Sequence, residues 1–401
     1  MRTIPALALA TSLSLLGDMT IYAVLPSRHA ALGISVAGVG VLLSVHRFIR
    51  IVGNPAAGAL CDRLGRRPPY LLGLVLAVAA TGGYLLADGF WPLLVARLVW
   101  GLAFALIHVA AFAIVLDVTT PADRGRALGT YSSLVGAGTM LAVLLGGAIT
   151  DLAGYRATLA AWVPLTALGL LVAWRALPET RPRAEPAAAG VARHVSLAAA
   201  YAQVGWPLLP PCYVGFVTFF AGNGVLMATM GKHVATHADA AWPLATLTGA
   251  LLALRRAVGI VTAPLAGRLS DGIGDRRRVA GLGALIGIAG FGVLALGQGL
   301  LAVVLGAALT ALGEGILTPA VSAWCGDLAP VPLRGVIMGG LATANDLGGA
   351  VGPLAGYAIG AALGFPTAYG LCAGLGLSSL LVLALARGPR NTNRSLRDHL
   401  P

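Results

Sequence analysis

Five arginines and three carboxylates lie inside the long apolar stretches of this sequence. The arginines are Arg47, Arg50, Arg97, Arg255 and Arg256, and the carboxylates are Asp18, Glu314 and Asp346. An arginine at the centre of a membrane helix costs about 2.5–3.5 kcal/mol on insertion scales, so five of them need compensation or a use. Even if every carboxylate pairs with one arginine, two positive charges are left over. This surplus predicts an anionic ligand.

Arg47 and Arg256 are the leading candidates for contact with that ligand. Arg47, Arg50 and Asn54 are spaced i, i+3 and i+7, so they share one face of a helix. Arg255 and Arg256 occupy the equivalent depth in the second half of the chain. The predicted substrate-binding set is Arg47, Arg256, Arg50, Arg255, Asn54, Tyr22 and Asn223. The alternative is that these arginines only form ion pairs that pack helices together.

The carboxylates are candidates for carrying protons. Burial disfavours the charged form of a carboxyl group and a nearby arginine favours it, so a site that alternates between these surroundings takes up and releases a proton. The predicted proton-coupling set is Asp18, Glu314, Asp346, Arg97 and His108. The alternatives are permanently ionised counter-charges for the arginines and, for His108, an ordinary core position.

The composition indicates which elements position these residues. The chain has 401 residues, of which 58% are hydrophobic and only 10% charged. Soluble proteins carry about a quarter charged residues, so an ordinary cytosolic enzyme is excluded, and the apolar content excludes disorder. Apolar runs of roughly 20 residues have the length that a helix needs to cross a bilayer. The sequence therefore predicts an all-α membrane protein.

The apolar runs predict twelve transmembrane helices in two sets of six. The first set covers 5–26, 36–60, 70–88, 91–117, 126–150 and 157–177, and the second covers 206–230, 241–266, 279–297, 299–326, 335–358 and 364–386. The predicted domains are an N-terminal six-helix bundle (1–177), a cytoplasmic linker (178–205), a C-terminal six-helix bundle (206–386) and a cytoplasmic tail (387–401). Arg2 before an apolar run resembles a signal peptide, but the run continues to full span length and favours an uncleaved first helix.

Basic residues predict the orientation. If the N-terminus lies inside, nineteen arginines fall on that side, and only Arg28, Arg156 and Lys232 fall on the other. Short cytoplasmic loops are enriched in Lys and Arg. We therefore expect both termini in the cytoplasm of a bacterial cell, with the protein in the inner (plasma) membrane.

The two sets of spans repeat one pattern. Gly58-x-x-x-Asp62-x-x-Gly65 recurs as Gly267-x-x-x-Asp271-x-x-Gly274, Arg124-Gly125-x-x-x-Gly129 recurs as Arg334-Gly335-x-x-x-Gly339, Asp117 matches Asp327, and Pro55 matches Pro264. These matches share an offset of 209 or 210 residues, which indicates duplication of a six-helix unit. Parallel repeats around a midplane site are a transporter architecture.

The segment from Gly58 to Arg67 resembles the signature between the second and third spans of major facilitator superfamily (MFS) transporters. Asp117, Arg97 and Leu177-Pro178-Glu179-Thr180 at the end of the sixth span are similar to that family as well, and the resemblance covers essentially the whole chain. It implies two six-helix bundles that rock about a central cavity, with spans 1, 4, 7 and 10 lining it.

The same segment predicts a conformational latch. Gly58 and Gly65 let helix ends approach closely, and Asp62 can accept hydrogen bonds at a neighbouring helix N-terminus. The predicted latch set is Gly58, Asp62, Arg63, Gly65, Arg66, Arg67, Asp117, Arg124, Gly267, Asp271, Gly274, Asp327 and Arg334, with Arg63 and Arg66 bridging Asp62 to Asp117. In the second copy Gly272 and Asp275 replace Arg63 and Arg66, so we expect a weaker latch there. The alternative is a basic loop that only sets topology.

These features predict a secondary active transporter that moves a small anion by alternating access, coupled to protons. The alternative is a proton-driven exporter of amphipathic compounds. Asp18-Met19-Thr20-Ile21 before Pro26 loosely resembles the first-span motif of multidrug exporters, but Ala142 and Val143 occupy the Gly-Pro positions of their span 5 motif. The arginines of spans 2 and 8 resemble those of nitrate/nitrite porters, whose Gly/Asn-rich signatures are absent.

An enzyme is not expected, because the sequence contains no nucleotide-binding loop, metal-ligand cluster or nucleophile–base constellation. It implies no cofactor and no metal. The expected partners are a small-molecule solute, protons and the lipid bilayer, without nucleic acid, and the expected oligomeric state is a monomer.

Overall fold

All twelve predicted spans are helical in the computed structural model, which describes residues 3–120, 123–180, 205–237, 242–273, 275–329 and 333–386. Apolar runs form helices because, in hydrocarbon, each backbone N–H and C=O must find its partner within the segment. Among the described residues, eleven segments are long and apolar enough to cross a membrane. The remaining span is α14, which has 30 residues.

The first six spans are formed by eight elements. They are α1 (Thr3–Ser14), α2 (Leu16–Arg28), η1 (His29–Leu32), α3 (Val36–Leu64), α4 (Arg67–Leu86), α5 (Phe90–Asp117), α6 (Arg124–Ala153) and α7 (Tyr155–Ala176). The first span is interrupted at Leu15, between α1 and α2. Ser35 caps α3 by accepting a hydrogen bond from the Gly38 N–H at 3.1 Å. The predicted boundaries hold to within a few residues.

The last six spans begin with one composite helix. It consists of η2 (Trp206–Leu208), α9 (Leu209–Thr218), η3 (Phe219–Leu226) and α10 (Met227–His237), followed by α11 (Leu244–Ile273), α12 (Arg276–Leu296), α13 (Gly299–Leu328), α14 (Arg334–Leu363) and α15 (Phe365–Leu385). The segment η3 is π-helical, a local widening that is frequent at functional sites. Its glycines permit close packing: a Cβ at Gly224 would lie 2.7 Å from the Cα of Gly352 on α14.

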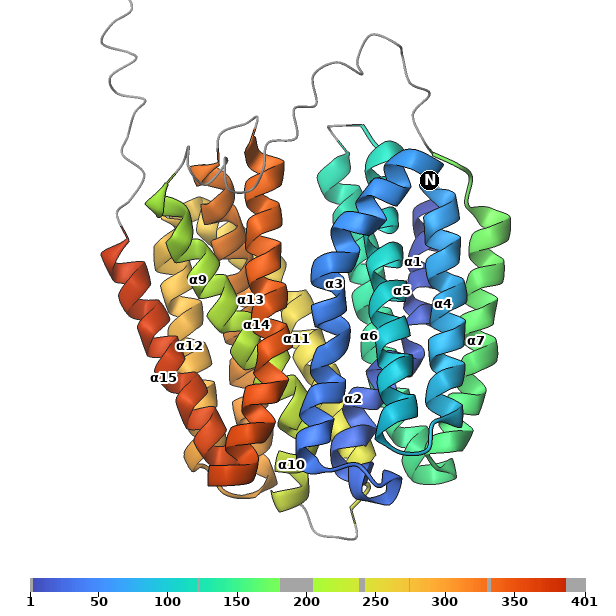
Figure 1. Ribbon diagram of the computed structural model, residues 1–401. Coiled ribbons are helices and arrows are strands. Elements are labelled where there is room, and N and C mark those ends of the chain that lie inside the picture. Colours follow the sequence, from blue (N-terminus) through green and yellow to red (C-terminus); the bar gives the residue numbers. More distant parts are fainter. Residues whose placement is uncertain are drawn as a thin grey trace, which may run out of the picture.

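The helices form two groups of six spans that stand side by side (Figure 1), α1–α7 in blue to green and α9–α15 in yellow-green to red. The first group ends at Ala176 and the second begins at Trp206, at the same end of the molecule. We call this end the linker end. The two groups meet at the opposite end and stand apart at the linker end (Figure 1). The predicted linker falls on 181–204 and the predicted tail on 387–401, which lie outside the described residues.

Small residues allow the two groups to touch closely. A Cβ at Gly249 on α11 would lie 2.5 Å from the Val143 carbonyl oxygen on α6. A Cβ at Gly40 on α3 would lie 3.1 Å from the Pro353 carbonyl oxygen on α14. Backbones that approach this closely need small residues at the contact. The pairs α6–α11 and α3–α14 therefore form most of the contact surface between the groups, and α2 adds contacts with α10 and α11.

Candidate functional site

A cavity of about 530 Å³ lies between the two groups of helices. Its walls come from α2 and α6 on one side and from η3, α10, α11 and α13 on the other. The expectation that span 4 lines the cavity is therefore wrong, and spans 5 and 8 contribute instead. Span 4 is α5, which packs within its own group: a Cβ at Gly101 would lie 2.7 Å from the His46 carbonyl oxygen of α3.

Three of the intramembrane arginines each pair with one carboxylate. Arg97 pairs with Asp18, Arg50 with Asp346 at 3.2 Å, and Arg255 with Glu314 at 2.9 Å. Within the part of the chain that the structure describes, Arg47 and Arg256 have no ion pair or side-chain hydrogen bond, and the Arg47 Nε is buried without a partner. The two surplus charges counted from the sequence are therefore Arg47 and Arg256.

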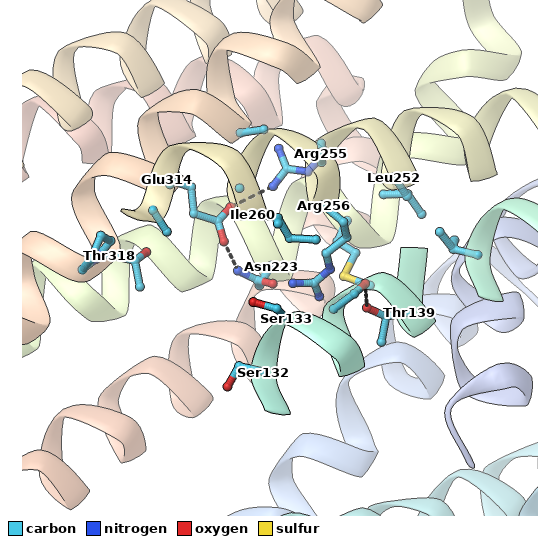
Figure 2. A pocket seen from close by; sticks show the side chains of 18 of the residues that line it. Ser132, Ser133, Thr139, Asn223, Leu252, Arg255, Arg256, Ile260, Glu314 and Thr318 are labelled. Carbon is cyan, nitrogen blue, oxygen red and sulfur yellow. Dashed lines mark hydrogen bonds and ion pairs between the residues drawn. The ribbon is translucent and has the colours of Figure 1, made fainter. Parts of the chain in front are cut away.

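Arg256 supplies an unneutralised positive charge to the cavity. It lies on α11 and lines the cavity between the helices, so its side chain is exposed to the cavity. Figure 2 shows its guanidinium among the lining side chains of Ser133, Thr139 and Asn223, and no dashed line reaches it. A guanidinium in this setting is suited to binding a carboxylate, sulfonate or phosphate.

Arg47 occupies a different environment. Only 9% of its surface is exposed, and it is not part of the cavity lining. Its guanidinium lies against Gly349 of α14, where any Cβ would collide with it. The expected clamp of Arg47 and Arg256 facing each other across the cavity is therefore not assembled in this structure, because α14 covers Arg47.

Glu314 and Arg255 form a hydrogen-bonded cluster in the cavity wall (Figure 2). Arg255 donates to the Thr310 hydroxyl at 2.7 Å and to the Gly222 carbonyl at 3.4 Å, in addition to its ion pair with Glu314. The other Glu314 oxygen accepts a hydrogen bond from the Asn223 amide at 2.5 Å. Because Gly222 and Asn223 belong to η3, the π-helical segment contributes directly to this cluster.

Asp18 and Arg97 join α2, α3 and α5 away from the cavity. Arg97, which is fully buried, donates to the Leu42 carbonyl at 2.9 Å and contacts the His46 Nδ1 at 2.7 Å, besides its pair with Asp18. Tyr22 lies 3.4 Å from the other His46 ring nitrogen. None of these residues is in the cavity lining, so the structure places Tyr22 in a buried network rather than at the predicted substrate site.

The remaining predicted residues of α3 and α5 lie near Arg50. Its ion pair with Asp346 joins α3 to α14 and therefore links the two groups of helices. Its guanidinium also lies 4.7 Å from the centre of the Phe104 ring. His108 packs between Phe104 and Phe112, a core position, and the buried Asn54 Oδ1 has no hydrogen-bond partner among the described residues. Arg50, Asn54 and His108 lie outside the cavity lining.

In the first latch segment, Arg66 bridges two of the predicted carboxylates. Arg66 donates to Asp62 at 2.9 Å and to Asp117 at 3.1 Å. Partial burial alone would lower the pKa of Arg66, but its bonds to these two carboxylates outweigh that effect and raise the pKa. Glu179 accepts hydrogen bonds from the Arg66 and Arg67 N–H groups at 2.8 and 3.1 Å. Gly65 has a φ of 94°, and a Cβ there would collide with the Glu179 carboxylate, so glycine is required.

All of these contacts stay within the first group of helices. The Asp62 side chain is 76% exposed, and within the described part of the chain its one partner is Arg66. The expected contact of Asp62 with a neighbouring helix N-terminus is not found among the described residues, and the two groups stand apart at this end. Arg63 and Arg124 are exposed, and Gly58 has open space around it.

The second latch segment uses a different residue from the one expected. Arg276 contacts Asp327 at 3.3 Å and donates to Ser270 at 3.0 Å, as Arg66 contacts Asp117 in the first copy. The assignment of Asp275 to the Arg66 position is therefore wrong by one residue, and Asp275 instead caps α12 by accepting from the Arg277 N–H. Gly267 faces open space, whereas Gly274 and the side chains of Asp271 and Arg334 lie outside the described residues.

Asp151 is a candidate functional residue that the sequence did not reveal. It lies in the last turn of α6 and accepts hydrogen bonds from the N–H and hydroxyl of Thr246, at 2.7 and 2.8 Å, in the first turn of α11. Arg28 lies 3.6 Å from its other oxygen. Asp151 thus caps a helix of the other group at the end where the groups meet. No local signal identifies a partner 95 residues away.

No group of three or more metal-ligating side chains occurs in the described ranges. The cavity is lined by charged and polar side chains set in a largely apolar wall.

This chain is similar to known proteins over nearly its whole length. A family model described as Major Facilitator Superfamily matches residues 7–255 and 211–399. Multidrug resistance protein MdtG of Dickeya zeae is 27% identical over 333 residues, which cover 81% of this chain and 78% of that protein. Probable vesicular acetylcholine transporter-B of Danio rerio is 31% identical over 119 residues, so the match spans 29% of this chain and only 24% of that relative.

Solved structures show the same fold. The nucleoside transporter NupG superposes with a TM-score of 0.79 at 12% identity, covering 96% of this chain and 100% of NupG. A bacterial homolog of the human lysosomal transporter Spinster, in an inward-facing and occupied conformation, gives 0.77 at 18% identity, covering 99% and 98%.

Proposed function

This chain belongs to the Major Facilitator Superfamily, and we propose that it is a secondary active transporter that moves a small anion across the bacterial inner membrane by alternating access. The family transports small-molecule solutes and does not act as enzymes. The anion, the membrane and the coupling to protons belong to the proposal.

The observation that carries the anion assignment is the unpaired Arg256 in the cavity. Its neighbour Arg255 forms an ion pair with Glu314, whereas Arg256 has no ion pair among the described residues. An unpaired charge inside a membrane protein is costly. A bound anion would supply the missing counter-charge, and the lining hydroxyls and amide would complete its hydrogen bonds.

The arrangement of the two groups supports alternating access. They meet mainly through α6–α11 and α3–α14 and stand apart at the linker end, where the described ion pairs of Arg66 with Asp62 and Asp117 stay within the first group. The excess of arginine on that side supports a cytoplasmic linker and cytoplasmic termini. We infer that this structure corresponds to the inward-open state.

Proton coupling is proposed through Asp18, Glu314 or Asp346, each of which forms an ion pair with an arginine. Protonation of any one of them releases a positive charge inside the membrane. Such a charge changes the relative stability of the inward-open and outward-open conformations. Coupling energies of this kind are typically about 1–3 kcal/mol.

Export of amphipathic compounds is the second candidate function. Much of the cavity wall is apolar, with Met19, Phe219, Met227, Leu252 and Ile260 among its residues. The relative MdtG is named a multidrug resistance protein and aligns with most of this chain. Both features fit a ligand with a large apolar part.

The test is a thermal-shift screen of the purified protein with panels of organic anions, organic cations and neutral amphipathic compounds. We expect organic anions to stabilise the wild type. They should also stabilise the Arg156→Gln control, because Arg156 forms an exposed ion pair with Asp88 and neither residue lines the cavity. The same anions should not stabilise Arg256→Gln. Stabilisation by cations or neutral compounds alone, or equal stabilisation of Arg256→Gln by anions, would replace the proposal with amphipathic export.

A further inference from the structure

Glu314 differs from the other two intramembrane carboxylates in its access to the cavity. Its side chain is 23% exposed and belongs to the cavity lining. The Asp18 side chain is 4% exposed, and that of Asp346 is 16% exposed, and neither lines the cavity. A ligand in the cavity can therefore reach Glu314 but not the other two.

Both oxygens of Glu314 are occupied by residues of the cavity wall. Oε2 binds Arg255 at 2.9 Å and Oε1 accepts from Asn223 at 2.5 Å. Arg255 and Arg256 are consecutive on α11, and both line the cavity. The only carboxylate bound to Arg255 among the described residues is that of Glu314, so the ionisation of Glu314 decides whether the cavity presents one unpaired guanidinium or two.

Few other charged or titratable groups face Glu314. From α11 these are Arg255 and Arg256, and from α15 they are Tyr369, a buried neutral phenol, and Cys372, which shares a small pocket with Glu314. The neighbouring residues of η3 and α12, Asn223, Gly283 and Gly287, do not titrate. On α13 itself Thr310 contacts Arg255. Among these described neighbours no second carboxylate can replace Glu314.

We propose that Glu314 competes with the anionic group of the substrate for Arg255, so that the cavity binds a proton on Glu314 together with an organic anion. This inference rests on the proposed anion transport. While Glu314 is ionised, it occupies Arg255 and repels a second negative charge. When a proton from solvent binds to a Glu314 oxygen, the ion pair is lost, and Arg255 joins Arg256 in binding the anion with charge-assisted hydrogen bonds.

The cavity also constrains the rest of the ligand. Its volume of about 530 Å³ is far larger than an inorganic anion needs, and Met19, Val143, Leu252 and Ile260 contribute apolar surface. The substrate class is therefore an organic acid with one anionic group on an apolar body. Because the proton and the anion occupy the cavity together, both move in the same direction.

The experiment uses 2-naphthoate as the probe and its neutral amide, 2-naphthamide, as the matched control, with binding to the purified protein measured by isothermal titration calorimetry. Between about pH 5.5 and pH 8.5 the probe stays ionised, because carboxylic acids titrate near pH 4. We expect its affinity to rise as pH falls, by up to about tenfold per pH unit for one co-bound proton. Titrations in two buffers with different ionisation heats should show net proton uptake on binding.

Three variants locate the proton. Glu314→Gln mimics the protonated side chain, so it should bind 2-naphthoate at high pH as tightly as the wild type does at low pH, without proton uptake. Arg255→Gln/Glu314→Gln keeps Arg256 but lacks the second guanidinium, so its affinity should stay at the weak, high-pH level. Asp346→Asn removes a carboxylate that does not line the cavity, and it should keep the pH dependence.

The outcomes separate the two proposals. If 2-naphthoate and other organic anions bind at no pH to any form, the proposed anion transport fails. If 2-naphthoate binds but its affinity in the wild type does not change with pH, the competition at Glu314 is wrong while anion binding stands; this measurement does not depend on any variant folding. Loss of the pH dependence in Asp346→Asn, or its retention in Glu314→Gln, would place the proton elsewhere.

Discussion

Arg255 and Arg256 are consecutive residues of α11, yet only Arg255 has a carboxylate partner. Glu314 binds Arg255 at 2.9 Å, while Arg256 extends into the cavity without an ion pair within the described ranges (Figure 2). Two adjacent guanidinium groups at the same depth in the cavity thus differ: one is in an ion pair, and the other is available to a ligand. This asymmetry is the basis of the proposed preference of the cavity for a negative ligand.

Substitution of Arg256 should separate charge from geometry. Arg256→Gln removes one charge-assisted contact, worth about 1.5–3 kcal/mol, so binding of a stabilising anion should weaken roughly 10- to 100-fold. Arg256→Lys should weaken it less, because an ammonium keeps the charge but loses the planar fork. Titration calorimetry measures both variants. Equal affinities for the lysine and glutamine variants would mean that the charge at this position does not contribute.

The pair of Arg97 and Asp18 should act mainly on stability. Arg97 is fully buried, so Asp18→Asn leaves a buried charge without its partner, at a cost of about 3–5 kcal/mol. Thermal unfolding in detergent should show a large loss for Asp18→Asn and partial recovery in Asp18→Asn/Arg97→Gln. Asp88→Asn, at an exposed ion pair, is the control and should change little. A fully stable Asp18→Asn would show that Arg97 is neutralised by other means.

The latch should affect the conformational equilibrium rather than the fold. Asp62 is exposed here and, among the residues that the structure describes, is bound only to Arg66, so Asp62→Asn should leave expression and thermal stability unchanged. Loss of its contact in the other conformation should shift the equilibrium by about 1–3 kcal/mol toward the present state and reduce transport severely. Transport at the wild-type rate by a well-expressed Asp62→Asn variant would show that the loop serves topology alone.

The sequence predicted the fold closely because each span is a separate local signal. Apolar length alone located all twelve helices, and counting charges gave a surplus of two positive ones. Which arginines remain unpaired could not be predicted, since Arg50 finds Asp346 across 296 positions of sequence. The cavity-lining role of α6 and the burial of Arg47 under Gly349 also depend on how the two groups of helices pack.

The duplicated segments show a second limit of sequence comparison. Aligning the two copies by their glycines assigned Asp275 to the position of Arg66, whereas aligning them by Asp117 and Asp327 assigns Arg276, the residue that makes the contact. The π-helical turn at η3 likewise leaves no periodicity signal in the sequence, although it brings Asn223 to Glu314.

Asp151 should hold the opposite end closed. Asp151→Asn keeps the shape but loses the charge at the N-terminus of α11, which is worth about 0.5–2 kcal/mol. In a background without the native cysteines, a cysteine placed at Met227 in the cavity should react faster with an impermeant thiol reagent from outside the cell when Asp151 is replaced. The Asp88→Asn change should leave that rate unaltered. An unchanged rate in Asp151→Asn would assign this contact to packing only.

The orientation in the membrane is testable with exposed positions. Cys61 is 2% exposed and is a poor probe, but Leu64 at the linker end is 57% exposed and Leu152 at the opposite end is 87% exposed. In the same cysteine-free background, an impermeant thiol reagent added to intact cells should label Leu152→Cys and spare Leu64→Cys. The reverse pattern would invert the topology.

Transport by the purified protein in liposomes tests the central claim most directly. Vesicles containing the wild type, Arg156→Gln or Arg256→Gln are given a pH gradient, acidic outside, and a labelled organic anion that stabilises the purified protein. The account predicts that the wild type and Arg156→Gln accumulate the anion until the gradient is collapsed by an ionophore, while Arg256→Gln does not. Accumulation by Arg256→Gln at the wild-type rate would contradict the assignment of Arg256 as the anion site.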